Sequence, residues 1–159
     1  MSLGNLAYMC SHFQNASRVG LPMISFTYTK LHLGVLLGLY RNGLINSVTI
    51  GTKMGPNMQP AEIEAYDPEK VALRRLWVSL KYKDGNPVIS KAAIVSRPSK
   101  RVTMKFEELK HIAGGRGIRK VAALQPGEIL LLRTDKGVLE CREAIAIRRG
   151  GEIICRFGL

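Results

Sequence analysis

The sequence predicts an α+β fold made of two small subdomains, and three observations support this class. Helix-like and strand-like segments are mixed without a regular strand–helix–strand repeat, so a parallel sheet is not expected. The 159 residues are 46% hydrophobic, which is enough for one medium core or two small ones. A turn-rich stretch lies between Lys83 and Ser90. We therefore expect an N-terminal subdomain over 1–83 and a C-terminal subdomain over 84–159.

The N-terminal subdomain is predicted to have the order α-β-α-β-β and to supply core packing and protein contacts. Apolar residues recur at helical spacing from Leu3 to Arg18, which indicates an amphipathic helix. A β-rich run (PMISFTYT) follows, and Thr29 is placed to cap a second helix that Gly43 ends. The segments LINSVTI and VALRRLWVSLKY predict two strands joined by a loop over 51–70, with Trp77 in the core.

The C-terminal subdomain is predicted to be mixed β with short helices. Its strands are expected in VISKAAIVS, RVTMK, GIRKVAAL, ILLLR and EIICRF, and a short helix in FEELKHIA. The residues from Arg133 to Gly137 are predicted to form a tight strand-to-helix corner. In this interpretation Asp135 caps a helix running from Val138 to Ala144.

Charge is the strongest compositional signal. The chain carries 24 Lys and Arg against 12 Asp and Glu, a net charge of +12. Residues 1–69 hold four of each sign, so the remainder of the chain carries the whole excess. A polyanion, most often nucleic acid, is the expected partner, and a merely solubilising surface is the alternative. No apolar run approaches the ~20 residues needed to span a bilayer, so no membrane contact is expected.

The sequence shows no pattern typical of a catalytic or metal site. Cys10, Cys141 and Cys155 form no Cys-x-x-Cys motif, and we expect them to be small buried hydrophobes rather than zinc ligands. The glycine-rich stretch GGRGIRK lacks the Gly-Lys-Ser/Thr of a phosphate-binding loop. We therefore expect no enzyme, no cofactor and no small-molecule substrate.

The corner before the last helix carries residues suited to reading RNA. The Thr134 hydroxyl can donate to or accept from base edges and the ribose 2′-OH. Arg133 and Lys136 can reach phosphates, Gly137 permits close approach, and Asp135 would keep the corner rigid. An ordinary capped helix start with solvated cations is the alternative. A basic turn (SRPSKR) and the stretch GGRGIRK add cations that could follow a phosphate chain.

Several motifs in order resemble one protein family. The segments VSRPSKRV, GGRGI, RTDKGVLECREA and GGEIICRF are similar to the second half of the small-subunit ribosomal protein S-eight family, and HFQNAS, TKL and LYRNGLI to its first half. The resemblance covers essentially the whole chain. It implies a two-part α+β fold without catalysis and an assembly role. Its implied partners are the central domain of small-subunit ribosomal RNA and neighbouring small-subunit ribosomal proteins.

The resemblance also assigns functional segments. Thr134, Lys136 and Gly137 match the family's hydroxyl-rich RNA-reading loop. SRP matches its basic turn, and GGE the loop that supports the site from behind. Together with the basic stretches above, the candidate RNA-binding residues are Asn15, Lys30, Ser96, Arg97, Lys100, Arg101, Arg116, Arg133, Thr134, Asp135, Lys136, Gly137 and Glu152.

Departures from the family pattern bear on the source of the protein. Arg133 and Asp135 replace two serines of the RNA-reading loop, while His12 and Gln14 replace two arginines of the first helix. The segment between Ile118 and Arg133 is several residues longer than in the family. Such drift is typical of an organellar member and predicts a mitochondrial, fungal-like protein, with a bacterial cytoplasmic protein as the alternative.

The predicted function is a structural constituent of the small ribosomal subunit that supports assembly and translation. One rival is a free-standing translational regulator that binds RNA hairpins through the same corner. A second rival is a nucleotide-dependent RNA-modifying enzyme that uses the GGRG stretch. Sedimentation with small subunits separates the first function from both rivals.

Binding to small-subunit ribosomal RNA should depend steeply on salt. The positive excess lies beyond residue 69, and each phosphate contact contributes about 0.9 or less to the slope of log affinity against log salt. Binding isotherms of the full chain on an RNA fragment, taken at several salt concentrations, measure this slope. A flat response would show that the charge does not drive binding.

Overall fold

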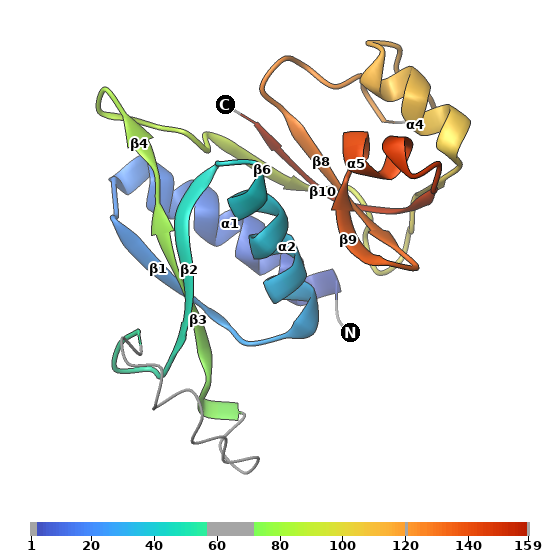
Figure 1. Cartoon of the computed structure of the whole chain (residues 1–159). Helices are drawn as coiled ribbons and strands as arrows, with labels where there is room; N and C mark the ends of the chain where they lie inside the picture. Colours follow the sequence, from blue (N-terminus) through green and yellow to red (C-terminus); the bar gives the residue numbers. More distant parts are fainter. Residues whose placement is uncertain (1–2, 57–71, 120, 159) are drawn as a thin grey trace.

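The structure is a computed structural model that describes residues 3–56, 72–119 and 121–158, and it has the predicted α+β class (Figure 1). The first half contains α1 (Leu3–Val19), β1 (Met23–Thr27), α2 (Lys30–Arg41), β2 (Ile45–Gly51), β3 (Arg75–Leu80), β4 (Tyr82–Lys83) and β5 (Asn86–Pro87). The second half contains β6 (Lys91–Ile94), β7 (Thr103–Met104), α4 (Phe106–Ala113), β8 (Ile129–Thr134), β9 (Gly137–Glu140), α5 (Cys141–Ala146) and β10 (Gly151–Gly158).

The first half is a three-stranded antiparallel sheet with two helices packed on one face. Its strand order is β1-β3-β2. The predicted cap of α2 is confirmed, since the Thr29 hydroxyl accepts a hydrogen bond of 3.0 Å from the backbone N–H of His32. Gly43, at φ 71°, lies just beyond the end of that helix, as predicted. Most of the loop predicted over 51–70 lies outside the described residues.

Trp77 does not lie in the core as predicted. The side chains of Leu76 and Val78 are fully buried beneath α1 and α2, so strand alternation puts Trp77 on the opposite face of the sheet. There it is half-buried, and its indole N–H donates to the carbonyl of Thr52 at 2.8 Å.

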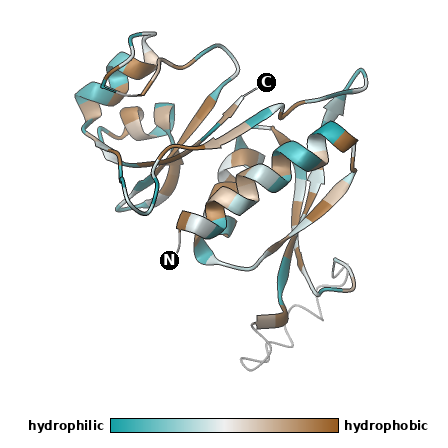
Figure 2. Ribbon diagram, turned by 180° about the vertical axis from the view of Figure 1, so that it is seen from behind, coloured by the Kyte–Doolittle hydropathy of each residue, from teal (hydrophilic) through white to brown (hydrophobic). Residues whose placement is uncertain are grey.

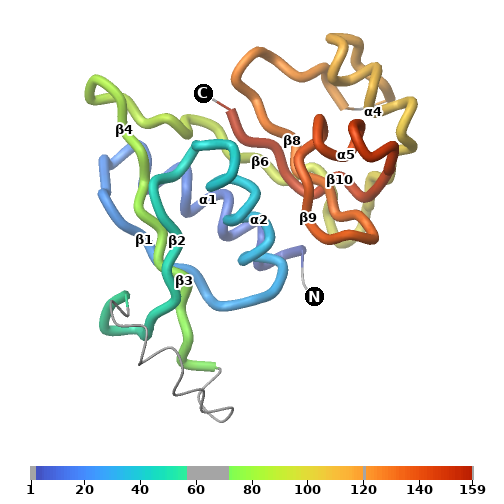
Figure 3. Tube along the Cα trace, viewed as in Figure 1, coloured from blue at the N-terminus to red at the C-terminus, as the bar shows by residue number. Residues whose placement is uncertain are grey.

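The second half is built around β10, which lies between β6 and β8 and also pairs with β7 (Figure 3). Strand β8 is buried on both faces, which explains its uninterrupted apolar run. Leu131 packs into the core beneath α1 and α2, while Leu130 and Leu132 pack beneath α4 and α5. The division of the chain into 1–83 and 84–159 stays a prediction.

Aromatic contacts join the two halves through α1. The ring of Phe13 on α1 lies 5.0 Å from that of Phe26 on β1 and 5.8 Å from that of Phe157 on β10, measured between centroids. Figure 2 shows many hydrophilic residues along α4, in keeping with a helix that buries only Leu109 and Ile112. Helix α4 therefore turns one face to a core, while its other face carries charged side chains.

The prediction of a strand-to-helix corner is wrong, because the segment is a β-hairpin. Thr134 pairs with Gly137, and the ladder continues to Leu131 opposite Glu140, so β9 precedes the helix. Two adjacent apolar residues, Val138 and Leu139, fit a strand as well as a helix, and pairing with β8 selects the strand.

The helix cap is consequently not Asp135. Helix α5 begins at Cys141, and the Glu140 carboxylate accepts hydrogen bonds from the N–H groups of Arg142 at 2.8 Å and Glu143 at 3.3 Å. Glu143 returns the interaction by accepting from the N–H of Glu140 at 3.1 Å, which completes a capping box. Burial raises the pKa of the Glu140 carboxyl, and the hydrogen bonds that it accepts partly offset this rise.

The prediction of a strand in GIRKVAAL is also wrong. Among its described residues only an isolated bridge joins Ile118 and Val121. The backbone groups that follow are used differently, because the guanidinium of Arg156 on β10 hydrogen-bonds to the carbonyls of Ala122 and Ala123. The extra length of this segment is thereby held against the sheet.

Glu128 and Arg156 together clamp this segment to β10. The Glu128 carboxylate pairs with Arg156 and accepts from the N–H of Gln125 at 2.8 Å. Burial alone would raise the pKa of Glu128, but these hydrogen bonds and the charges of Arg156 and Lys91 outweigh it and lower the pKa. The clamp therefore stabilises the fold at neutral pH and loses that contribution as the pH falls through the lowered folded-state pKa.

The cysteines are buried and unpaired, as predicted. Burial raises the pKa of the Cys141 thiol to about 11, so this group is a thiol at neutral pH. Within the described ranges, no three His, Cys, Asp or Glu side chains are close enough together to hold a metal ion. No helix of the described part is long and apolar enough to cross a bilayer.

Replacing the two acidic residues of the hairpin should separate the true cap from the predicted one. Glu140→Ala removes the acceptor for two helix N–H groups and should destabilise the protein by about 0.5–2 kcal/mol. Asp135→Ala removes only an exposed ion pair and should change stability by less than about 0.5 kcal/mol. Urea unfolding of both variants measures the difference, and equal losses would contradict this assignment.

Candidate nucleic-acid interface

Three segments meet at the end of the C-terminal sheet where β10 begins. They are the basic turn (residues 96–101), the β8–β9 turn (residues 133–137) and the arginine–glycine segment (residues 148–151). Glu152 pairs with Arg133 on one side of β10 and with Thr103 on the other. Two loops far apart in sequence are thus brought to the same end of one strand.

The close approach of these segments requires glycine at two positions. A Cβ atom on Gly151 would lie 2.4 Å from the carbonyl oxygen of Arg133, and one on Gly150 would lie 2.5 Å from that of Met104. Both distances are far shorter than a carbon–oxygen contact permits, and the obstructing atoms are backbone. The glycine pair therefore sets how tightly the β8–β9 turn and the start of α4 are held together.

The hydroxyl of Thr134 closes the β8–β9 turn. It donates to the carbonyl of Gly137 at 3.0 Å and accepts from the N–H of Lys136 at 3.2 Å. A hydroxyl has one proton, so Thr134 in this arrangement could offer RNA only an acceptor. Asp135 lies outside this bonding and forms an exposed ion pair with Arg149, at 3.6 Å.

The basic turn is organised by a buried serine. The Ser96 side chain is inaccessible, accepts from the N–H of Val102 at 3.0 Å and donates to its carbonyl at 3.4 Å. Two backbone hydrogen bonds of 3.0 Å link Arg97 and Lys100 and tighten the loop between them. Ser96 is therefore placed to position the turn, while Arg97, Lys100 and Arg101 project their charges outward.

Glu152 lies beneath these cations. Its side chain is only 12% exposed, and one carboxylate oxygen lies 3.8 Å from the Nε of Arg101. That oxygen accepts no hydrogen bond within the described residues. The carboxylate is thus placed to hold Arg101 by charge from behind, and its own access to a ligand is limited.

Together the three segments and the start of α4 form what we term the cationic surface. Its exposed cations are Arg97, Lys100, Arg101, Lys105, Arg133, Lys136, Arg148 and Arg149. The three segments contain one acidic residue, Asp135, and it is exposed. A hollow of about 590 Å³ lies between residues 104–106, 133–135 and 148–151. Fixed cations around a shallow hollow are suited to holding several phosphates of one polyanion.

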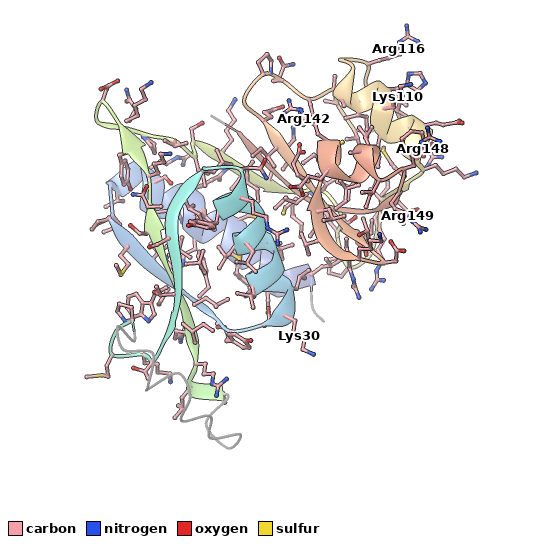
Figure 4. All side chains as sticks on the ribbon, viewed as in Figure 1. Lys30, Lys110, Arg116, Arg142, Arg148 and Arg149 are labelled. Atoms are coloured by element: carbon pink, nitrogen blue, oxygen red, sulfur yellow. The ribbon has the colours of Figure 1, made fainter. Side chains whose placement is uncertain are left out.

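The structure does not bring every candidate residue to this surface (Figure 4). Lys30 lies at the start of α2. Asn15 lines a different hollow with Tyr8 and His12 of α1. Arg116 lies beyond the end of α4, where it shares a further hollow with Lys110.

Sequence reasoning missed three cations of the surface, namely Lys105, Arg148 and Arg149. A signal was present for two of them, because Arg148 and Arg149 directly precede the glycine pair that the close approach requires. Lys105 carries no such signal, since it reaches the surface only through the pairing of β7 with β10.

Comparison with known proteins identifies similar chains. The sequence profile of the family described as ribosomal protein S8 matches residues 4–157. The small ribosomal subunit protein uS8m of Neurospora crassa is 41% identical over 98% of this chain and 99% of its own length. The protein of the same name from Schizosaccharomyces pombe is 34% identical, over 95% and 97%. The bacterial small ribosomal subunit protein uS8 of Granulibacter bethesdensis is 31% identical, over 95% and 94%.

A pair of substitutions should show whether the Thr134 hydroxyl closes the turn. Thr134→Val keeps the shape and leaves the N–H of Lys136 without its acceptor, so the protein should lose about 0.5–1.5 kcal/mol of stability. Thr134→Ser retains the hydroxyl and should lose less. Thermal melts of the two variants provide the comparison, and a Thr134→Val protein as stable as Thr134→Ser would rule out the structural role.

Proposed function

The chain belongs to the ribosomal protein S8 family, and we propose on that premise that it is a structural, non-catalytic component of the small subunit of a mitochondrial ribosome. Two fungal relatives that match nearly the whole chain carry the mitochondrial name uS8m, at 41% and 34% identity. The bacterial relative from Granulibacter is less similar, at 31%. This gradient supports the mitochondrial over the bacterial location.

The observation that carries the proposal is the cationic surface. Its exposed cations come from separate segments, yet β10 and the glycine pair hold these segments at one end of the sheet. Rigid spacing of cations reduces the entropy lost on binding an extended polyanion. The same surface exposes backbone turns rather than a closed pocket, which suits a folded RNA better than a small ligand.

We infer that the RNA is the central domain of small-subunit ribosomal RNA and that the surface reads it in two ways. Arg97, Lys100, Arg133 and Lys136 contact phosphates, which positions the protein on the RNA. The free lone pair of Thr134 accepts a hydrogen bond from a base amino group or a 2′-OH, which adds specificity. The first half of the chain contributes contacts to neighbouring small-subunit proteins.

Two matched double variants test this function. Arg97→Ala with Lys136→Ala removes two cations of the surface, whereas Lys53→Ala with Lys83→Ala removes two exposed cations elsewhere. The first pair should lower the slope of log affinity against log salt by about 1.5–2 on a central-domain RNA fragment. The control pair should change it by much less.

Two results would count against the proposal. Equal slope changes in both double variants would show that net charge, and not this surface, drives binding. A tagged chain that never sediments with mitochondrial small subunits would favour the free-standing hairpin-binding regulator.

A further inference from the structure

The three-stranded sheet of the first half ends at β2, although α2 extends past it. Strand β2 pairs with β3 along one edge, and within the described residues no named strand pairs with its other edge. In Figure 1 β2 lies beside α2. The inner face of β2 packs on the core, where Val48 and Ile50 are half-buried beside α2.

Helix α2 presents an apolar strip next to this open edge. Leu33, Leu37 and Tyr40 are spaced at i, i+4 and i+7, which places them on one side of the helix. Leu37 is 39% exposed and Tyr40 is 52% exposed, whereas Leu33 is half-buried against the same core as Val48 and Ile50. Through Leu33, the strip therefore adjoins the same core on which β2 packs.

The open edge lacks two of the features that usually prevent pairing, namely charged residues and proline. Residues 44–52 carry no charge and no proline. At the start of β2, the register shift between Ile45 and Ser47 and the hydrogen bond from the Lys81 ammonium to the carbonyl of Gly43 lie on the side that pairs with β3. At the other end Gly51 forms a bridge with Pro56. Within the described part of the chain, no strand pairs with the backbone of residues 46–50 along this edge.

We propose that this edge accepts an extended strand from a neighbouring protein of the small subunit, which pairs with β2 and covers Leu37 and Tyr40. Residues of the added strand that face α2 are apolar at alternate positions, because that face meets the helix strip. This inference rests on the proposed function, which places the chain in an assembly.

The chemistry favours a peptide over the other possible occupants. The edge offers backbone donors and acceptors beside an apolar strip. Nearby cations of the described residues, such as Arg41, Lys53 and Lys81, lie at its ends, so it does not suit a phosphate chain. A second copy would bring together two chains that each carry a net charge of +12. A strand of a different, less basic protein meets neither obstacle.

Two measurements on the tagged full chain in purified small subunits test the inference. Amide hydrogen exchange over residues 45–51 should be slow in the subunit but fast for part of these amides in the free chain. A photoreactive p-benzoyl-phenylalanine at position 40 should cross-link to the backbone or side chains of another ribosomal protein. The same group at position 19, where Val19 is exposed on the end of α1, is the matched control.

The outcomes separate this inference from the proposed function. Cross-links from position 40 to ribosomal RNA alone, a cross-linked dimer of the tagged chain, or exchange that is already slow in the free chain would each overturn the inference while the proposed function stands. Absence of the chain from small subunits would overturn both.

A charge placed on the strip gives an independent readout. Tyr40→Glu should reduce the occupancy of the chain in small subunits by at least about threefold, because an acid would be buried beneath the added strand. Val19→Glu should leave occupancy near that of the unmodified chain, and thermal melts check that both variants fold. Equal occupancy of the two variants would contradict a strand over Tyr40.

Discussion

The pairing of β10 on both edges is the constraint on which the rest of the structure depends. At its start β10 holds β7 and β8, and further along it pairs with β6 and carries Phe157 into contact with α1. Near its end, Arg156 clamps the segment that leads into β8. One strand thus joins the two cores and fixes the positions of loops that are distant in sequence.

The cationic surface follows from this constraint rather than from any single basic motif. Each of its three segments contributes only two or three cations. The ion pairs of Arg101 with Glu152 and of Arg149 with Asp135 are too exposed to fix the segments by themselves. Backbone contacts position the three segments. Gly150 and Gly151 permit the close approach, Glu152 pairs with Arg133 of β8, and Thr134 closes the β8–β9 turn. The side chains remain exposed, so their charges are available to an RNA while their backbone is held by these contacts.

Local chemistry predicted much of the fold, and tertiary pairing explains what it missed. Thr29 and Gly43 mark the ends of α2 through interactions within a few residues, so their roles were predictable. Val138 and Leu139 fit either a helix or a strand, and only pairing with β8 decides between them. The candidate site was partly predictable for a similar reason. Its charges are visible in the sequence, but the burial of Ser96 and the position of Lys105 at the cationic surface depend on β10.

The most direct measurement of the central claim is the location of the β8–β9 turn in an intact mitochondrial small subunit, determined by cryo-electron microscopy. We predict that ribosomal RNA lies against this turn and the basic turn, with phosphate oxygens within hydrogen-bond distance of Arg97 and Lys136. A map in which both turns face solvent, or contact only protein, would contradict the claim that this surface binds RNA.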